Sequence, residues 1–352
     1  MRYPEFLKVR GTIGFVAPSF GCAIEPYRSA FENARKKWRE EGFFLDLGPN
    51  CFAGEGIGIS ASPEKCGAEF NEYYVKRAND CLISCGGGEL MCEILEYVDF
   101  EAIKAAKPKW FMGYSDNTNI TFLLTTLCDV AAVYGPCAAA FGMEPWHQSL
   151  RDAMEILKGG KQSVESYGMW ESEGKKDEEH PLEPYHCTQE LKIKSFLPVG
   201  MGEKKTMEPS ENTSMEGRLV GGCMDCLVNL LGTKFDRVGR FLDAYKEDGF
   251  VWFLESCDLN VFGVRRAMWQ MEQAGWFRYV KGFLIGRPFC HGQEMMGLDQ
   301  YEAVLPVAAR CGVPVVMDVD LGHLPPMMPL VSGSFARVLA ENNRLKVDMI
   351  YR

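Results

Sequence analysis

Short apolar runs alternate with amphipathic segments over the first 150 residues. Each run is four to six residues long, the length of a buried strand, and the segments between them have the period of a helix. The predicted strands are 12–17, 43–47, 81–85, 109–112 and 131–134, and the predicted helices are 28–41, 62–77 and one that ends near residue 127. Alternating strands and helices favour a mostly parallel sheet flanked by helices, so we predict an α/β domain over residues 1–158.

The pattern weakens over residues 159–216. This stretch is polar and includes the charged run 173–179, so we interpret it as a linker with an exposed loop. Such a loop is either a solvated surface or a lid over a cleft. From residue 217 the chain is again globular, and we predict a C-terminal domain over 217–352. Its predicted strands are 218–220, 250–254, 282–285 and 313–317, its helices are 224–231 and 261–273, and 336–339 with 345–350 form a closing hairpin.

Charge and hydropathy exclude several classes of protein. The chain has 352 residues, a formal net charge of −10 and a pI near 5.2, which argues against binding a nucleic-acid polymer. No stretch approaches the roughly 18 consecutive apolar residues of a spanning helix, and the N-terminal segment lacks the apolar region of a signal peptide. We therefore expect a soluble, cytoplasmic protein with no membrane partner.

The 14 cysteines do not indicate a disulfide framework, because the chain is long and lacks a secretory signal. Cys223 and Cys226 form a C-x-x-C pair, but no second pair or nearby histidine completes a zinc site, so buried thiols are the simpler interpretation. The glycine clusters at 54–58 and 86–88 fit neither the dinucleotide nor the P-loop spacing. We therefore expect no metal and no cofactor.

One segment has the pattern of a nucleophile elbow. An apolar strand leads into Gly113-Tyr114-Ser115, and a helix follows, so a sharp turn would present the Ser115 hydroxyl at the end of the sheet. The usual second glycine is replaced by Asn117. The alternative is that Ser115 or Asp116 only caps the helix.

A serine nucleophile needs a base and an orienting acid. His323 lies in a loop after the predicted strand 313–317, and Glu255 ends the apolar strand 250–254. Each also has a structural interpretation, His323 as an ordinary loop residue and Glu255 as the start of a helix. The turn 86–88 could supply backbone N–H groups to an oxyanion or bind a phosphate at a helix N-terminus.

The motifs, in this order, resemble the S66 serine peptidase family, which includes LD-carboxypeptidases and microcin C immunity hydrolases. The resemblance covers nearly the whole chain and rests on 11–19, 83–88, Pro108-Lys109 with 113–118 (G-Y-S-D-x-T), 217–222, 253–255 with Arg266, and Gly322-His323 with Pro329-Leu330. The chain departs from common family residues at Gly86, Cys223 and 256–257.

The resemblance implies specific roles. Ser115 would be the nucleophile, His323 the base and Glu255 its partner, with the backbone N–H groups of Asp116 and of Gly87 or Gly88 as oxyanion donors. It also implies a C-terminal domain with a β-rich, barrel-like sheet, an active site where the two domains meet, and a homodimer.

Two substrates follow from the resemblance, both small molecules or short peptides. The first is a murein tetrapeptide that loses its terminal D-amino acid during peptidoglycan recycling, and the second is an aminoacyl-nucleotide amide. Trp170 in the polar stretch favours the second, since it could stack on adenine, although it could equally pack locally; Tyr114 is a further candidate substrate contact. A non-catalytic binding protein on the same scaffold is the remaining alternative.

Overall fold

The computed structural model describes residues 1–200 and 205–352, and the described residues form two compact units. Unit 1 comprises Met1–Gln162, Glu173–His186 and Pro329–Val331. Unit 2 comprises Ser163–Ser172, Cys187–Met328 and Ser332–Arg352. Each unit is built around its own sheet.

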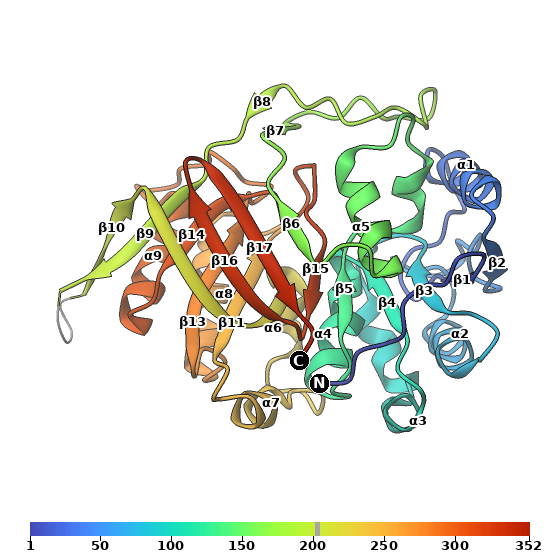
Figure 1. Cartoon of the computed structure of the whole chain (residues 1–352), viewed down its shortest axis with the longest axis horizontal. Helices are drawn as coiled ribbons and strands as arrows, with labels where there is room; N and C mark the ends of the chain where they lie inside the picture. The colour runs from blue at the N-terminus through green and yellow to red at the C-terminus, as the bar shows by residue number, and fades with distance from the viewer. Residues whose placement is uncertain (201–204) are drawn as a thin grey trace. The chain divides into compact units, whose positions relative to one another are not determined.

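Unit 1 contains a six-stranded sheet flanked by helices (Figure 1). Its strand order is β15-β5-β4-β3-β1-β2, and β1 to β5 pair in parallel. The strands are β1 Thr12–Val16, β2 Phe44–Leu47, β3 Cys81–Ser84, β4 Trp110–Gly113, β5 Ala132–Tyr134 and β15 Leu330–Ser332. The predicted parallel α/β architecture is therefore confirmed. Strand β15 was not predicted and comes from the distant C-terminal part of the chain.

The helices of unit 1 begin and end at recognisable signals. The Ser62 side chain accepts a hydrogen bond from the Lys65 N–H at the start of α2, with Pro63 in the first turn, and α5 ends at Gly159 in the left-handed conformation. The helices are α1 Tyr27–Glu40, α2 Pro63–Val75, α3 Phe100–Ala105, α4 Thr118–Thr126 and α5 Gln148–Lys158, with 3₁₀ helices η1 Met91–Tyr97, η2 Ser115–Asn117 and η3 Ala138–Gly142.

Unit 2 is the expected β-rich unit, with nine strands in the order β10-β9-β14-β13-β12-β11-β16-β17-β6. Strands β11 to β14 pair in parallel, and β16 with β17 is the predicted closing hairpin. The strands are β6 Ser163–Glu165, β9 Lys194–Val199, β10 Thr206–Ser210, β11 Asn212–Cys223, β12 Phe250–Glu255, β13 Val280–Gly286, β14 Val315–Val319, β16 Phe335–Glu341 and β17 Arg344–Ile350. The helices are α6 Met224–Leu230, α7 Val238–Ala244, α8 Val261–Gln273 and α9 Gln300–Cys311.

The interpretation of residues 159–216 as linker and exposed loop is wrong in part. Strands β6, β9 and β10 and the first half of β11 lie there, as does the two-stranded pair of β7 Met169–Trp170 and β8 Gln189–Glu190. Strands β6 and β10 are the two ends of the nine-stranded sheet, so among the described residues one flank of each has no partner strand, and most of their residues are polar. The charged run 173–179 is mostly exposed, as expected. Residues 201–204 of this stretch lie outside the described residues.

Aromatic side chains fill both cores and hold the strands that lead to the functional loops. In unit 1 the ring of Phe15 lies 5.2 Å from that of Phe31 and 5.1 Å from that of Trp38. In unit 2 Trp252 of β12 stacks on Trp276 at 5.8 Å. All of these side chains are fully buried, so the strand ends are fixed by packing.

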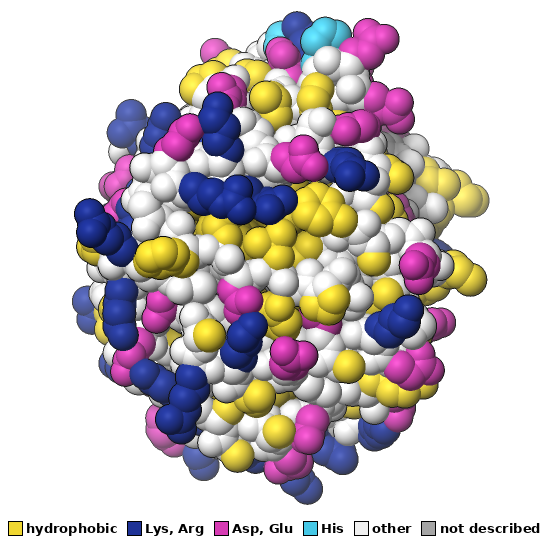
Figure 2. All heavy atoms as spheres, turned by 90° about the vertical axis from the view of Figure 1, so that its right-hand side faces the viewer, with side chains coloured by type: hydrophobic (Ala, Val, Ile, Leu, Met, Phe, Trp, Pro, Cys, Tyr) yellow, Lys and Arg dark blue, Asp and Glu magenta, His cyan; other side chains and the backbone are white. Residues whose placement is uncertain are grey.

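Positive and negative side chains are mixed on the face shown in Figure 2, with apolar side chains between them. No helix within the described residues is long and apolar enough to cross a membrane.

A buried lysine joins α2 to the start of β4. The Lys109 ammonium donates to the Tyr73 carbonyl at 2.9 Å, to the Lys76 carbonyl at 2.5 Å and to Asn79 Oδ1, while the side chain is only 7% exposed. It therefore caps the C-terminal end of α2, where a positive charge is favourable.

Replacing Lys109 with methionine is expected to lower the free energy of unfolding by about 2–4 kcal/mol, because three buried acceptors lose their donor. The matched control is Lys107→Met, since Lys107 is exposed and only forms a 2.7 Å ion pair with Glu5; its change should be about 0.5 kcal/mol or less. Urea unfolding followed by circular dichroism measures both, and equal values for the two variants would refute the capping role.

Candidate active site

Ser115 lies directly after β4, on the turn that leads into η2 and α4. Its φ is +62°, a left-handed conformation that is uncommon for a residue with a side chain and is typical of a strained nucleophile turn. The Ser115 backbone N–H donates to the Tyr134 hydroxyl at 3.2 Å, so β5 helps to hold the turn. Tyr114, the other residue of this turn named from the sequence, is half-buried, and its ring lies 6.5 Å from that of Tyr134.

Asn117 explains why this turn lacks the usual second glycine. Its fully buried amide donates to the Gly86 carbonyl at 2.8 Å and to the Tyr114 carbonyl at 3.1 Å. The Asn117 side chain lies close to Gly113, since a Cβ on Gly113 would be 2.8 Å from the Asn117 Cγ. Asn117 thus links the glycine turn to the nucleophile turn.

The carboxylate of Asp116 holds the same turn from the other side. It accepts hydrogen bonds from the Ser19 hydroxyl at 2.6 Å, from the Met91 N–H at 2.9 Å and from the Asn119 amide at 3.1 Å. Burial nevertheless raises the pKa of Asp116 to about 6. Its backbone N–H, the predicted oxyanion donor, therefore belongs to a residue that is fixed by three elements of the fold.

Of the two candidate glycines, Gly87 lies against Ser115. A Cβ on Gly87 would be 3.3 Å from both Cβ and Oγ of Ser115. Gly88 faces away from it, because a Cβ there would meet the Ser19 hydroxyl and, at 2.7 Å, the Gly58 carbonyl. Of these two glycines, Gly87 is therefore the one beside the Ser115 hydroxyl.

These two glycines give a matched pair of substitutions. Gly87→Ala is expected to lower kcat for amide hydrolysis by about 10²–10³, because the new methyl group crowds the Ser115 hydroxyl and displaces an oxyanion donor. Gly88→Ala should instead lower the melting temperature, because its methyl group collides with backbone. Steady-state kinetics and thermal unfolding of both variants check this; a stable, fully active Gly87→Ala enzyme would exclude the role of Gly87.

In unit 2 the predicted base and acid form a close pair. His323 Nδ1 lies 2.8 Å from Glu255 Oε2, and Glu255, the last residue of β12, is fully buried. The left-handed Gly322, with φ of +106°, allows this approach, since a Cβ on it would be 2.7 Å from the same oxygen. Burial opposes charge on the imidazole, but the Glu255 carboxylate and hydrogen bonds to Cys257 and Glu255 outweigh it and raise the pKa of His323.

The segment after Glu255 is anchored by a residue that the sequence did not indicate. Asp225, in the first turn of α6, accepts from the Cys257 N–H at 3.0 Å and from the Asp258 N–H at 2.9 Å. Cys223 also donates its thiol to this carboxylate at 3.3 Å. Cys223 of the C-x-x-C pair is thus bonded to the carboxylate that anchors the segment after Glu255. The described residues contain no group of three metal-binding side chains.

Trp170 is largely buried in unit 2. Its indole N–H donates to the Glu190 carbonyl at 3.2 Å, and its ring lies 4.9 Å from the Arg287 guanidinium and 5.2 Å from the His291 ring. One part of the ring lines a cavity of about 470 Å³. The cavity is further lined by the charged residues Glu190, Lys192, Lys194, Arg287 and Asp318 and by Thr188, Gln189, His291 and Tyr301.

Arg287 is the main residue of this region that sequence reasoning missed. It is fully buried, and it donates to the Asp318 carbonyl at 2.9 Å and to Asp320 Oδ1 at 2.6 Å. Asp320 lies three residues before His323, so Arg287 fixes the start of the histidine loop. A basic residue directly after an apolar strand was the available signal.

Two segments of the chain match known domains. Residues 13–135 match the LD-carboxypeptidase N-terminal domain of the S66 peptidases, and residues 216–338 match the LD-carboxypeptidase C-terminal domain. The chain belongs to the S66 peptidase family. The resemblance stated from the sequence is therefore confirmed, and relatives in this family are peptidases and hydrolases, which supports an enzyme.

Individual S66 relatives match over nearly the full chain. One relative is a Vibrio cholerae protein that has been assigned as a carboxypeptidase by inference. The two sequences are 22% identical over 99% of this chain and 98% of the relative. The microcin C7 self-immunity protein MccF of Escherichia coli is 23% identical over 98% and 95%.

Solved structures of S66 proteins have the same fold. MccF without ligand has a TM-score of 0.78 at 22% identity and covers 99% of this chain and 98% of its own. An MccF-like protein from Bacillus anthracis has a TM-score of 0.77 at 20% identity, with full coverage of both chains. MccF has also been solved in complex with aspartyl sulfamoyl adenosine.

Proposed function

We propose that the protein hydrolyses an amide bond by acyl transfer to Ser115, with His323 as the base and Glu255 as its partner. The observation that carries this proposal is the strained turn at Ser115, whose hydroxyl faces Gly87 at the carboxyl end of β4. A serine in such a turn has a conformational cost that a mere helix cap would not require.

In the proposed mechanism His323 accepts the Ser115 proton as the Ser115 oxygen attacks the carbonyl carbon. The Glu255 carboxylate keeps the proton on Nδ1 and stabilises the imidazolium, in keeping with the raised pKa of His323. The N–H groups of Asp116 and Gly87 receive the charge of the carbonyl oxygen. His323 then returns the proton to the leaving amine, and water releases the acyl group.

The first proposed substrate is a murein tetrapeptide, which would lose its terminal D-amino acid. The match of both halves of the chain to LD-carboxypeptidase domains supports it. The test is incubation of the protein with a tetrapeptide ending in D-Ala, followed by mass spectrometry. We expect release of D-Ala by the wild type and none above background by Ser115→Ala.

The second proposed substrate is an aminoacyl-nucleotide amide. Two observations favour it: MccF structures contain such ligands, and the cavity beside Trp170 combines an aromatic wall with Lys192 and Lys194. Aspartyl and glutamyl sulfamoyl adenosine are the compounds to assay, with release of the amino acid as the readout. Loss of this activity in Trp170→Ala, with tetrapeptide cleavage unchanged, would assign Trp170 to nucleotide binding.

The nucleophile can be tested without knowing the substrate. A fluorophosphonate reagent should label the wild type at Ser115, as identified by peptide mass spectrometry, and should not label Ser115→Ala. Labelling without turnover of either substrate would leave the hydrolase proposal in place and reject both substrates. Absence of labelling would favour a non-catalytic binding protein. The predicted homodimer is checked by light scattering.

A further inference from the structure

A second cavity, of about 400 Å³, lies in unit 1 at the edge of the sheet opposite the nucleophile. Its lining comes from the segments that precede β1, β3 and β4, three neighbouring strands of the parallel sheet. Ser115 and Gly87 follow the carboxyl ends of β4 and β3, whereas this cavity is at the amino ends. The two sites are therefore separated by the length of the strands, roughly 13 Å for four residues.

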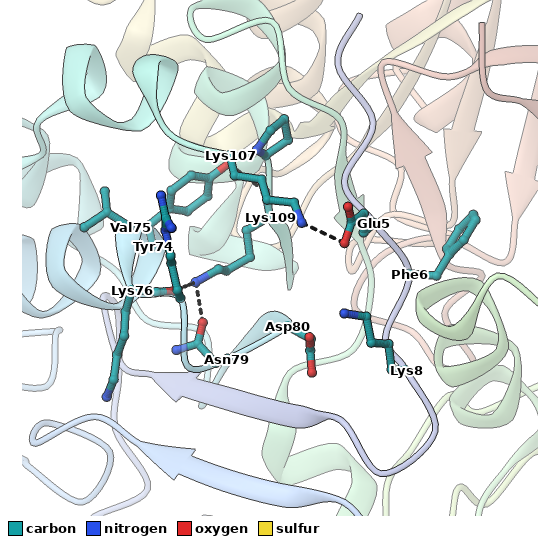
Figure 3. Close-up of a pocket in the computed structure, with 12 residues that line it drawn as sticks. Glu5, Phe6, Lys8, Tyr74, Val75, Lys76, Asn79, Asp80, Lys107 and Lys109 are labelled. Atoms are coloured by element: carbon teal, nitrogen blue, oxygen red, sulfur yellow. Dashed lines mark hydrogen bonds and ion pairs between the residues drawn. The ribbon is translucent and has the colours of Figure 1, made fainter.

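The cavity is strongly basic in an acidic protein. Five cationic side chains line it, against the two carboxylates of Glu5 and Asp80, while the whole chain has a net charge of −10. The cations are Lys8, Lys76, Arg77, Lys107 and Lys109. Figure 3 shows Lys8, Lys107 and Lys109 around one hollow.

Both carboxylates are already engaged with the protein. Glu5 forms a 2.7 Å ion pair with Lys107, and the hydrogen bond to Lys107 lowers the pKa of Glu5. Asp80 Oδ2 accepts from the Thr12 N–H at 2.8 Å. Glu5 is thus paired with Lys107, while Asp80 keeps its negative charge and offsets part of the charge of Lys109. The lining therefore has more positive than negative groups, five against two.

Two of the cations form no direct ion pair with the described residues. Lys76 pairs with Asp46 at 2.9 Å, and the three donors of Lys109 are used by Tyr73, Lys76 and Asn79. The exposed side chains of Lys8 and Arg77, in contrast, have no hydrogen-bond or ion-pair partner within residues 1–200 and 205–352. They can turn toward an anion without breaking an existing contact.

The floor of the cavity also favours an anion. Burial lowers the pKa of Lys109 to about 8, although the nearby carboxylates of Asp46 and Asp80 act in the opposite direction. A negative charge in the cavity would favour the charged form of Lys109. Tyr74 and Phe6 add apolar wall, and a volume near 400 Å³ is in the range of small-molecule sites.

We propose that this cavity binds a small phosphorylated anion, with Lys8 and Arg77 contacting the phosphate oxygens and Lys107 and Lys109 supplying charge around them. A multiply charged phosphate fits because several cations surround one hollow of limited volume. This site is independent of the hydrolase reaction, since none of its residues takes part in the proposed mechanism.

Calorimetric titration of the full chain with inorganic pyrophosphate tests the proposal, at low ionic strength because salt screens exposed charges. We expect saturable binding by the wild type, and binding weakened by at least about tenfold in the double variant Lys8→Glu/Arg77→Glu. The matched control is Arg240→Glu/Lys246→Glu, which makes the same change of charge on exposed residues of unit 2 and should bind like the wild type.

Several outcomes would overturn the proposal. These are no saturable binding by the wild type, equal weakening in both double variants, or equal binding of chloride at matched ionic strength. Binding of a long polyanion such as heparin without binding of pyrophosphate would show that the cavity takes a macromolecular polyanion and not a small anion. Should the charge reversal unfold the protein, as seen by circular dichroism, Lys8→Gln/Arg77→Gln serves instead, and unchanged pyrophosphate affinity in that variant also contradicts the proposal.

Discussion

Replacement of Ser115 with alanine is expected to lower kcat for amide hydrolysis by about 10⁴–10⁶ while leaving the fold intact. The hydroxyl is the proposed attacking group, and the two side chains that follow it cannot replace it: Asp116 is buried and bonded to Ser19 and Met91, and Asn117 is bonded to Gly86. Substrate binding should change little, because only an interaction of the transition state is lost.

The measurement is steady-state kinetics with whichever amide the wild type cleaves, together with thermal unfolding. Ser214→Ala is the control, since Ser214 is an exposed serine of β11, and it should retain full activity. Residual activity of Ser115→Ala above a few per cent of wild type would mean that another group is the nucleophile.

Replacement of Glu255 with glutamine is expected to lower kcat by about 10⁴. Glutamine has nearly the same shape, but it is neutral and cannot stabilise the His323 imidazolium. Its NH₂ group can also donate to Nδ1, which would hold the imidazole in the wrong tautomer. Loss of the buried negative charge removes a cause of the raised His323 pKa, so that pKa should fall.

The substitution should therefore change both the maximum rate and the pH dependence of the rate. Activity requires neutral His323, so the acidic limb of the rate profile should move to lower pH in Glu255→Gln while the maximum rate falls. Glu247→Gln, at an exposed position, should leave both limb and maximum unchanged. An acidic limb that stays in place in Glu255→Gln would show that this limb does not report His323.

The sequence predicts the buried elements well and the sheet margins poorly. Strands such as β3 and β4 are continuous apolar runs because they are buried on both faces, and this pattern is visible without neighbours. Strands β6 and β10 are mostly polar and lie at the two ends of their sheet, so no continuous apolar run marks them. Periodicity within a short window cannot reveal their pairing.

The candidate site likewise contains residues that the sequence predicts and residues that it does not. Ser115, Glu255 and His323 were named because strand ends and glycine loops mark them. The groups that hold them were not: the Asp116 carboxylate, Asp225 and Arg287 act through contacts between residues 25 to 97 positions apart. Those contacts exist only once the chain has folded. The position of Arg287 directly after an apolar strand was the one local signal, and it does not reveal the distant partner Asp320.

The position of β15 has a consequence for how the protein is made. This strand, seven residues beyond His323, completes the sheet that carries Ser115. A ribosome delivers the N-terminal strands first, so until residues 330–332 emerge the flank of β5 lacks its neighbour and is open to pairing with other chains. The sheet of unit 1 is therefore complete only after residues 330–332 have been synthesised, and an isolated fragment of residues 1–158 should be prone to aggregation.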